Sequence, residues 1–505
     1  MHHLDGSSLT LDQLTAIADA AAPVGLDPGA AARVDAARRV VDARASGDTP
    51  VYGVNTGFGA LAETAIPRDR LGALQLNLLR SHAAGVGEPL PVRAVRASMA
   101  LRANVLAKGF SGIRRSTLEL LIAMLNRGVH PVVPSRGSVG ASGDLAPLAH
   151  MALVLVGEGQ AVVQDSAAMP GIDALRRAGL APVTLESKEG LALINGTQPS
   201  TAIAALGVVR AERVMRAADV AAALSVDGLR GSVRPFDARI HEARPHPGQQ
   251  AAAANIRTLL AGSAINASHA HCRRVQDAYS LRCAAQVHGA ARDAIAFARR
   301  TLEIEANAAT DNPMVFGDAG EIVSGGNFHG APIAIAADLL AIAVTQFATI
   351  SERRSDRLVN PALSDLPAFL TTDSGLQSGY MIAQVTAAAL ASELKTLAHP
   401  ASVDTIPTSA NREDHVSMSM GAALKAARAV DAVARVLAVE VLCACQAVDL
   451  LAPLETSAPL ARVHAFVRSL APTLTIDRPP APDIESIAAA ILDGSFERAC
   501  GVEVK

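Results

Sequence analysis

The pattern of hydrophobic and polar positions changes near residue 198. Before it, short stretches with helical periodicity alternate with Gly- and Pro-rich loops, most clearly at 51–63 and 131–147. After it come long segments rich in Ala, Leu, Arg and Glu, residue types that favour helices. The pattern therefore predicts a mainly α protein with small β elements near the N-terminal loops, divided into domains 1–198 and 199–505. The predicted long helices span residues 199–228, 277–309, 331–357, 376–397 and 417–450.

Several of these segments are apolar on nearly all sides, and residues 331–350 (APIAIAADLLAIAVTQFATI) are the clearest case. Such a helix must be covered on every face, and one subunit could hardly bury five of them. We therefore expect a central long-helix bundle that is shared between the subunits of a homo-oligomer. Asp338 interrupts this apolar run, so we expect no membrane-spanning helix.

Composition narrows the function classes. The chain has 505 residues, of which 50% are hydrophobic, so it can bury a large core. Its formal net charge is only −3 and its charges are scattered, which argues against a nucleic-acid surface. The N-terminus lacks the basic start and apolar run of a secretion signal, so we expect a cytoplasmic location.

Cysteines and histidines give no sign of a disulfide framework or a metal site. The five cysteines, an odd and sparse set, are expected to be buried thiols: Cys272, Cys283, Cys443, Cys445 and Cys500. The run His269-Ala270-His271 and the pair His241 and His246 lack the spacing of zinc motifs. Lysines are few, and none stands in a recognisable pyridoxal phosphate setting. We therefore expect neither a metal nor pyridoxal phosphate.

The most informative stretch is the glycine-rich loop 137–144 (GSVGASGD), which lacks the G-K-[ST] ending of a phosphate-binding loop. A tight bend would bring the Gly143 nitrogen onto the Ala141 carbonyl carbon and close a five-membered ring. Loss of water completes the ring, and loss of the Ser142 hydroxyl leaves an exocyclic methylene. The product, methylidene-imidazolone, is a strong electrophile. The neighbouring glycines tolerate the strained dihedrals, although a bare Ala-Ser-Gly tripeptide is usually an ordinary turn.

Further motifs lie along nearly the whole chain. They include YGVNTGFG (52–59), SHAAGVG (81–87), GSVGASGDLAPLAH (137–150), KEGLALINGTQ (188–198), VQDAYSLRC (275–283), SGGNFH (324–329) and SANREDHVSM (409–418). Together they resemble the aromatic amino acid ammonia-lyase and aminomutase family, most closely its histidine-specific ammonia-lyases. The resemblance implies that Ala141-Ser142-Gly143 becomes the methylidene-imidazolone prosthetic group. It also implies that the homo-oligomer is a tetramer.

Removing ammonia from an amino acid requires a good leaving group and a base for the β-hydrogen. The electrophile supplies the first requirement. By resemblance, Tyr52 is the catalytic base, although a lone loop tyrosine is more often a packing anchor. Its loop, Gly53 to Gly59, is expected to act as a mobile lid. Asp144 either assists ring formation or caps the helix that follows it.

The resemblance also implies the residues that bind the substrate. Arg282 pairs with the substrate carboxylate, which its planar fork can hold through two oxygens. Gln276 and Tyr279 precede it by six and three residues and help to hold the electrophile and substrate. Asn195 is implied to form a hydrogen bond near the prosthetic oxygen. Phe328 is implied to pack beside the prosthetic ring, with an ordinary core aromatic as the alternative.

His82 and Glu413 favour histidine as the substrate. A carboxylate at Glu413 can accept an imidazole N–H, and His82 can hydrogen-bond to the ring or stack on it. A phenyl ring offers no such donor and would leave a buried carboxylate unpaired. Ser81-His82 and Glu413-Asp414-His415 also resemble the histidine-specific pattern. The alternatives are a structural histidine at 82 and a helix-capping carboxylate at 413.

The expected activity is therefore the deamination of L-histidine to trans-urocanate and ammonia. Two positions depart from the family pattern: Ala278 stands where Pro is common, and Arg412 stands where histidine-specific members usually have Gln. Arg412 adjoins Glu413 and puts the strictness of substrate choice in doubt. One alternative is a tyrosine or phenylalanine ammonia-lyase or an aminomutase on the same scaffold. Another is a non-enzymatic helical oligomer, against which the intact tripeptide and Tyr52 argue.

Overall fold

The computed structural model describes residues 1–47, 49–57, 59, 63–164, 166–270 and 275–505. Cys272, His271 and part of the expected lid at 58 lie outside the described residues. The contacts group the chain into two compact units of three segments each. The first comprises Met1–Val209, Arg299–Ala337 and Ala401–Leu424, and the second comprises Arg210–Ala298, Asp338–Pro400 and Lys425–Lys505. Whether residues 1–198 fold as a separate domain stays a prediction.

The first unit combines short helices with small sheets. Its helices are α1 (Leu11–Asp19), α2 (Pro28–Ala45), α3 (Leu71–His82), α4 (Val92–Ala107), α5 (Arg115–Asn126), α6 (Leu145–Leu155), α7 (Gly171–Arg177) and α8 (Glu189–Ile194), with the 3-10 turns η2 (Arg68–Arg70) and η5 (Ser409–Asn411). Its strands are β1 (His2–Leu4), β2 (Val24–Leu26), β3 (Val86–Pro89), β4 (Val129–Pro131), β5 (Pro134–Arg136), β6 (Gln160–Val163), β7 (Met169–Pro170), β8 (Met314–Phe316) and β9 (Glu321–Val323).

The strands form four separate small sheets, in keeping with the small β elements that the sequence predicts. Their orders are β1-β2, β3-β5, β4-β6-β7 and β8-β9. The pair β1-β2 is parallel, and the pairs β3-β5, β4-β6, β6-β7 and β8-β9 are antiparallel. In the antiparallel pair β3-β5, Val86 faces Arg136 and Pro89 faces Pro134, so the loop that follows β5 starts from a fixed edge.

Four long helices have residues in both units: α9 (Gln198–Gly228), α14 (Ala284–Glu305), α15 (Ala331–Val359) and α17 (Ser419–Leu450). The rest of the second unit consists of η3 (Arg234–Phe236), α10 (Ala238–Glu242), α11 (Pro247–Leu260), α12 (Ala264–Ser268), α13 (Tyr279–Arg282), η4 (Ala368–Leu370), α16 (Met381–Leu397), α18 (Ala458–Leu470), α19 (Ala481–Asp493) and α20 (Ser495–Arg498). The predicted mainly α class is confirmed. Among the long helices, α9, α15 and α17 lie close to the predicted ranges.

Two of the predicted helices are longer than the helices in the structure. The helix expected at 277–309 is two helices, α13 and α14, separated by Cys283, whose φ of −100° and ψ of 12° leave the helical region. The helix expected at 376–397 begins only at Met381. Gly379 has φ +54°, and a Cβ there would overlap the Phe369 carbonyl oxygen, so a tight turn replaces the first helical residues.

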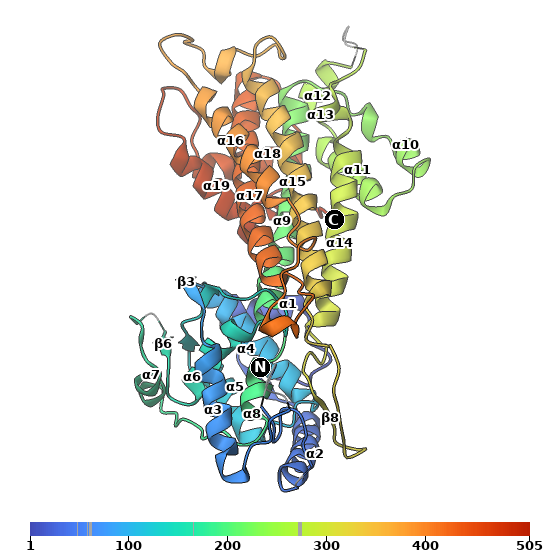
Figure 1. Cartoon of the computed structure of the whole chain (residues 1–505). Helices are drawn as coiled ribbons and strands as arrows, with labels where there is room; N and C mark the ends of the chain where they lie inside the picture. Colours follow the sequence, from blue (N-terminus) through green and yellow to red (C-terminus); the bar gives the residue numbers. More distant parts are fainter. Residues whose placement is uncertain (48, 58, 60–62, 165, 271–274) are drawn as a thin grey trace. The chain divides into compact units, whose positions relative to one another are not determined.

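In the second unit, the long helices pack through buried polar links as well as apolar contacts. Figure 1 shows α9, α15 and α17 running alongside one another, and Glu440 of α17 connects them. Its carboxylate accepts from Ser225 of α9 at 2.6 Å and from Nη2 of Arg354 of α15 at 2.9 Å. Arg354 and Glu440 are fully buried, and pairing offsets the cost of removing their charges from water.

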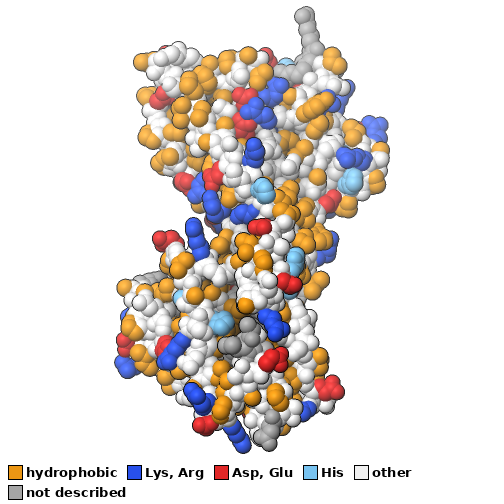
Figure 2. Space-filling model, viewed as in Figure 1, with side chains coloured by type: hydrophobic (Ala, Val, Ile, Leu, Met, Phe, Trp, Pro, Cys, Tyr) orange, Lys and Arg blue, Asp and Glu red, His pale blue; other side chains and the backbone are white. Residues whose placement is uncertain are grey.

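Among the described helices, only α15 is long and apolar enough to match a membrane span by composition. Of its most apolar 18-residue window, 72% is buried within the protein, as in the core helix of a bundle. Asp338, the charge that interrupts this run, lies 3.4 Å from the Lys425 ammonium. On the face shown in Figure 2, basic and acidic side chains are interspersed rather than gathered by sign.

The structure describes four of the five cysteines that were expected to be buried thiols. Cys443, Cys445 and Cys500 are buried free thiols, whereas Cys283 is only half-buried. No group of three or more His, Cys, Asp or Glu side chains within the described ranges has an arrangement that could hold a metal ion.

Candidate active site

The tripeptide Ala141-Ser142-Gly143 lies between β5 and α6 in the first unit, with Ser142 half-exposed between two buried neighbours. Gly143 has φ +71° and pairs with Gly196 in an isolated parallel bridge. A Cβ at Gly143 would overlap the Gly196 carbonyl group, so only glycine fits both the dihedral and the approach. The next amide, that of Asp144, donates to the Gly196 oxygen at 2.8 Å. The segment after α8 therefore packs directly against Gly143.

Asp144 is fully buried directly after the tripeptide. Its carboxylate accepts hydrogen bonds from the Ser138 hydroxyl at 2.6 Å and the Ser200 N–H at 2.8 Å. Burial raises the pKa of Asp144, while these bonds act to lower it. Within the described residues, its side chain makes no capping bond to α6, so the capping alternative is wrong. The carboxylate instead links the loop to the start of α9.

Asn195 ends α8 and is 3% exposed. The Arg102 guanidinium holds this segment, since it donates to the Asn195 carbonyl oxygen at 2.8 Å and to Oε1 of Gln198 at 2.7 Å. Arg102 is itself fully buried, and burial lowers its pKa to about 10. In the described part of the chain, Oδ1 of Asn195 has no hydrogen-bond partner. This buried acceptor lies one residue from Gly196, so a hydrogen-bond donor near the tripeptide would satisfy it.

Glu413 is presented by a strained turn. Ser409, Ala410 and Asn411 all have positive φ, which costs free energy for Ser and Ala and less for Asn. Thr408 and Glu413 pair across the turn as an antiparallel bridge, and the Thr408 hydroxyl donates to Oε2 at 2.5 Å. Arg412 is exposed and makes no ion pair with Glu413 in the described structure.

His82 is the last residue of α3 and is half-buried. Its Nδ1 lies 2.9 Å from the Leu78 carbonyl oxygen. A carbonyl oxygen can only accept, so Nδ1 carries the hydrogen and the neutral ring presents Nε2 as an acceptor. Burial lowers the pKa of His82, while the Leu78 hydrogen bond and the Glu413 charge act to raise it. The acceptor form is therefore favoured at neutral pH.

Tyr52 lies in a turn of the loop that the sequence singles out, and its phenol oxygen is 3.5 Å from the Gly59 N–H. Burial raises the pKa of Tyr52, the Gly59 hydrogen bond lowers it, and the Glu413 charge raises it. Because Glu413 acts on the titration of both Tyr52 and His82, these three predicted site residues share one region of the first unit.

Phe328 is half-buried in the turn before α15. The next residue, His329, stacks on His415 with ring centroids 5.8 Å apart and planes 6° apart, and its Nε2 is 3.1 Å from the His415 carbonyl oxygen. The residue after that, Gly330, donates its N–H to the Gly140 oxygen at 3.4 Å. The two residues after Phe328 thus contact the segment after Glu413 and the tripeptide loop, respectively.

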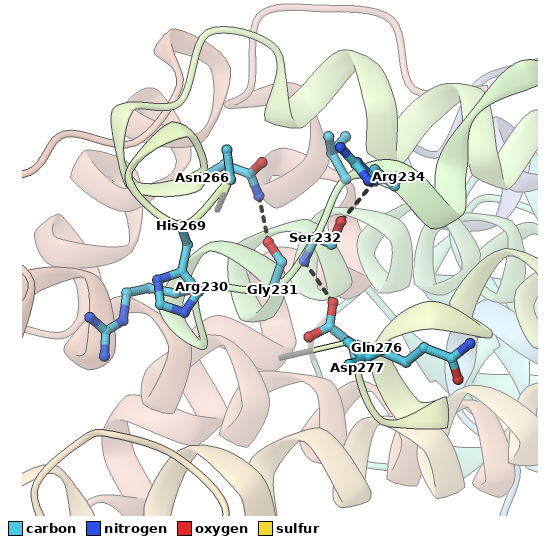
Figure 3. Close-up of a pocket in the computed structure, with 11 residues that line it drawn as sticks. Arg230, Gly231, Ser232, Arg234, Asn266, His269, Gln276 and Asp277 are labelled. Atoms are coloured by element: carbon cyan, nitrogen blue, oxygen red, sulfur yellow. Dashed lines mark hydrogen bonds between the residues drawn. The ribbon is translucent and has the colours of Figure 1, made fainter. Parts of the chain in front are cut away.

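Gln276, Tyr279 and Arg282 lie in the second unit. The Arg282 guanidinium sits 4.6 Å from the Tyr279 ring centroid, and its Nε donates to the Asp277 carbonyl oxygen at 2.9 Å. Tyr279 is 69% exposed. Gln276 borders a cavity of about 270 Å³, and Figure 3 shows it next to Asp277, with His269 farther away across the pocket.

Sequence reasoning assigned no role to Arg102 or to Ser417. The signal for Arg102 is its position in MALRANVLA, where apolar residues surround a charge that must then be paired. Ser417 falls within the motif SANREDHVSM, but a serine in a loop carries no distinctive signal by itself. Its contact with the tripeptide loop appears only in three dimensions.

Comparison with known proteins settles the family. The model for aromatic amino acid lyases matches residues 9–469. The chain belongs to the aromatic amino acid lyase family. A histidine ammonia-lyase of Anaeromyxobacter sp. (strain K) is 58% identical over 502 residues, covering 98% of this chain and 99% of that relative.

Solved structures of the family share this fold. The histidine ammonia-lyase of Trypanosoma cruzi has a TM-score of 0.92 at 47% identity, covering 99% of this chain and 94% of that one. A tyrosine aminomutase from Streptomyces globisporus has a TM-score of 0.94 at 39% identity, with complete coverage of both chains. Since the family fold carries more than one reaction, the side chains around the substrate must distinguish them.

Proposed function

We propose that the protein is a histidine ammonia-lyase, which converts L-histidine to trans-urocanate and ammonia without oxidation. The observation that carries the proposal is that Glu413 and His82 lie in the same region of the first unit, where the Glu413 charge acts on His82. Glu413 offers a charged acceptor, and His82 offers Nε2 as a second acceptor. An imidazole donates one N–H when neutral and two when protonated, whereas a phenyl ring donates none. The similarity to histidine ammonia-lyases over nearly the full chain length supports the same substrate.

We infer that Ala141-Ser142-Gly143 forms the methylidene-imidazolone group. The residues present fit it: Gly143 lies against Gly196, and the buried Asn195 amide has capacity left beside it. The side-chain N–H of Asn195 would donate to the oxygen of the group, and Phe328 would cover its ring. When formed, the group supplies an electrophile that makes the substrate amine a good leaving group.

Tyr52 is proposed as the base that takes the β-hydrogen. Burial and the Glu413 charge raise its pKa, so the phenol is protonated at neutral pH in the protein alone. A substrate ammonium would favour the phenolate by its positive charge, and Glu413 is proposed to accept the phenol proton. The loop from Gly53 to Gly59 would exclude water while the proton moves.

Arg282 is proposed to bind the substrate carboxylate, assisted by Gln276 and Tyr279. The Nε of Arg282 is engaged by Asp277, which fixes the plane of the guanidinium. The high exposure of Tyr279 supports a site completed in an assembly, and we propose a homo-oligomer, a tetramer by family resemblance, in which subunits share active sites. A cytoplasmic location and independence from metal and pyridoxal phosphate are part of the same proposal.

A substrate panel tests this function. Purified protein is given L-histidine, L-tyrosine and L-phenylalanine, and product absorbance and released ammonia are measured. We expect trans-urocanate and ammonia from L-histidine only. Faster turnover of an aromatic substrate would favour the tyrosine or phenylalanine ammonia-lyase alternative, and a β-amino acid product without ammonia release would favour an aminomutase.

A further inference from the structure

The segment that follows Glu413 forms hydrogen bonds with the tripeptide loop. The Ser417 hydroxyl donates to the Gly140 carbonyl oxygen at 2.9 Å, and the Met418 N–H donates to the Val139 carbonyl oxygen at 2.8 Å. Both bonds act on the two residues immediately before Ala141. Residues 417–419 are separated from this loop by most of the chain, so the contact is purely tertiary.

The Gly140 backbone and the side chains of Ser417 and Ser419 lie very close together. Gly140 has φ +67°, and a Cβ there would overlap Oγ of Ser417 and Oγ of Ser419. A Cβ at Gly330 would crowd the same two oxygens. Met418 has φ +59°, a conformation that costs free energy for a residue with a side chain. The surrounding contacts hold Met418 in this conformation, which keeps Ser417 and the Met418 amide facing the loop.

The direction of the Ser417 hydroxyl is also set. The Ser419 backbone N–H donates to Oγ of Ser417 at 3.2 Å, so this oxygen accepts on one side and donates to Gly140 on the other. Ser417 is 5% exposed, and little water competes for the bond. Ser419 is fully buried, but its Oγ has no hydrogen-bond partner among the described residues.

The far end of the loop is fixed as well. The Asp144 amide is bound to Gly196, and the Asp144 carboxylate is bound to Ser138 and Ser200. The three reacting residues therefore lie between an anchored Gly140 and an anchored Asp144. Fixed ends hold reacting atoms near their bonding geometry and reduce the entropy lost in reaching it.

We propose that Ser417 is a positioning residue for formation of the prosthetic group, because its hydroxyl holds the peptide that leads into Ala141. This inference rests on the proposed function. The Gly143 nitrogen bonds to the Ala141 carbonyl carbon, and the Ala141 oxygen leaves as water with the amide hydrogens of Gly143 and Ser142. The Ser142 hydroxyl leaves as a second water with the hydrogen on its own Cα. The step needs no oxidant or further reactant.

The test follows ring formation directly. Wild type, Ser417→Ala, Ser417→Cys and Ser419→Ala are expressed in a short pulse, and intact mass is recorded over time for the loss of two waters. Circular dichroism verifies folding. Losing one neutral hydrogen bond should slow the loss of water in Ser417→Ala by roughly two- to tenfold. Ser417→Cys, with a weak S–H donor, should lie between Ser417→Ala and wild type. Ser419→Ala keeps its backbone N–H and should match wild type.

The outcomes separate the two proposals. Ring formation at the wild-type rate in folded Ser417→Ala overturns the role of Ser417. Equal slowing in Ser417→Ala and Ser419→Ala also overturns it, because packing rather than the hydrogen bond would then be responsible. A wild-type protein that never loses two waters overturns the proposed prosthetic group and this inference with it.

Discussion

The Thr408 hydroxyl lies 2.5 Å from Oε2 of Glu413 and ties this carboxylate to its own turn. The turn is strained at Ser409 and Ala410, so the position of Glu413 depends on the fold around it rather than on local preference. The same carboxylate acts electrostatically on Tyr52 and His82, which come from the other end of the chain. Glu413 is therefore the residue whose replacement should most directly reveal substrate choice.

Replacing Glu413 by Gln should lower kcat/KM for L-histidine by roughly 10- to 150-fold, the cost of a charge-assisted hydrogen bond felt in the transition state. Gln keeps the size but loses the charge and presents N–H donors. The exposed neighbour Asp414 provides a matched control, since Asp414→Asn removes a carboxylate from the same segment. Histidine turnover within twofold of wild type in Glu413→Gln would rule out Glu413 as the selector.

His82 should give the reaction a pH dependence of its own. Burial lowers its pKa, so neutral His82 persists below the usual value of about 6.5 and Nε2 stops accepting only at lower pH. As pH falls through that lowered pKa, kcat/KM for L-histidine should fall. His82→Gln cannot titrate and should lack this acid limb, while ionisation of the substrate affects both proteins alike. Identical acid limbs in the two pH profiles would refute the assignment.

Tyr52→Phe should keep the fold and the loss of two waters but reduce kcat by about 10²- to 10⁴-fold, the usual contribution of a general base. Intact mass and circular dichroism check the first part, and steady-state kinetics check the second. A near-normal rate would move the base role to another group, with Glu413 the next to test.

The exposed apolar side chains of α16 should lie in an interface between subunits. Ile382 and Val385, one helical turn apart, are 61% and 51% exposed. Light scattering of the wild type should give a mass above that of one chain. The double replacement by Glu should shift the protein toward smaller species and lower its activity, because shared sites would be lost. A stable and active wild-type monomer would contradict both the interface and the shared sites.

Much of the fold can be predicted from local pattern. The long Ala-rich segments predict α9, α15 and α17 closely, because helix propensity and the lack of Gly and Pro act residue by residue. The break at Cys283 and the late start of α16 were not predicted. The start of α16 is set by the close approach of Gly379 to Phe369. Helix periodicity along the chain does not report this contact.

By itself, the sequence indicated the tripeptide proposed to react, the class of chemistry and the residue types that could select histidine. Tertiary structure decided which of these residues share a region and in what state. The tertiary contacts bind the Asp144 carboxylate to Ser138 and Ser200 rather than to α6, and the Leu78 hydrogen bond leaves Nε2 of His82 as the acceptor. Tertiary structure also placed Ser417 against Gly140 and left the Asn195 amide with unused capacity. The physical reason is that hydrogen-bond partners, burial and charge act over distances in space, whereas residue type and spacing report only on neighbours along the chain.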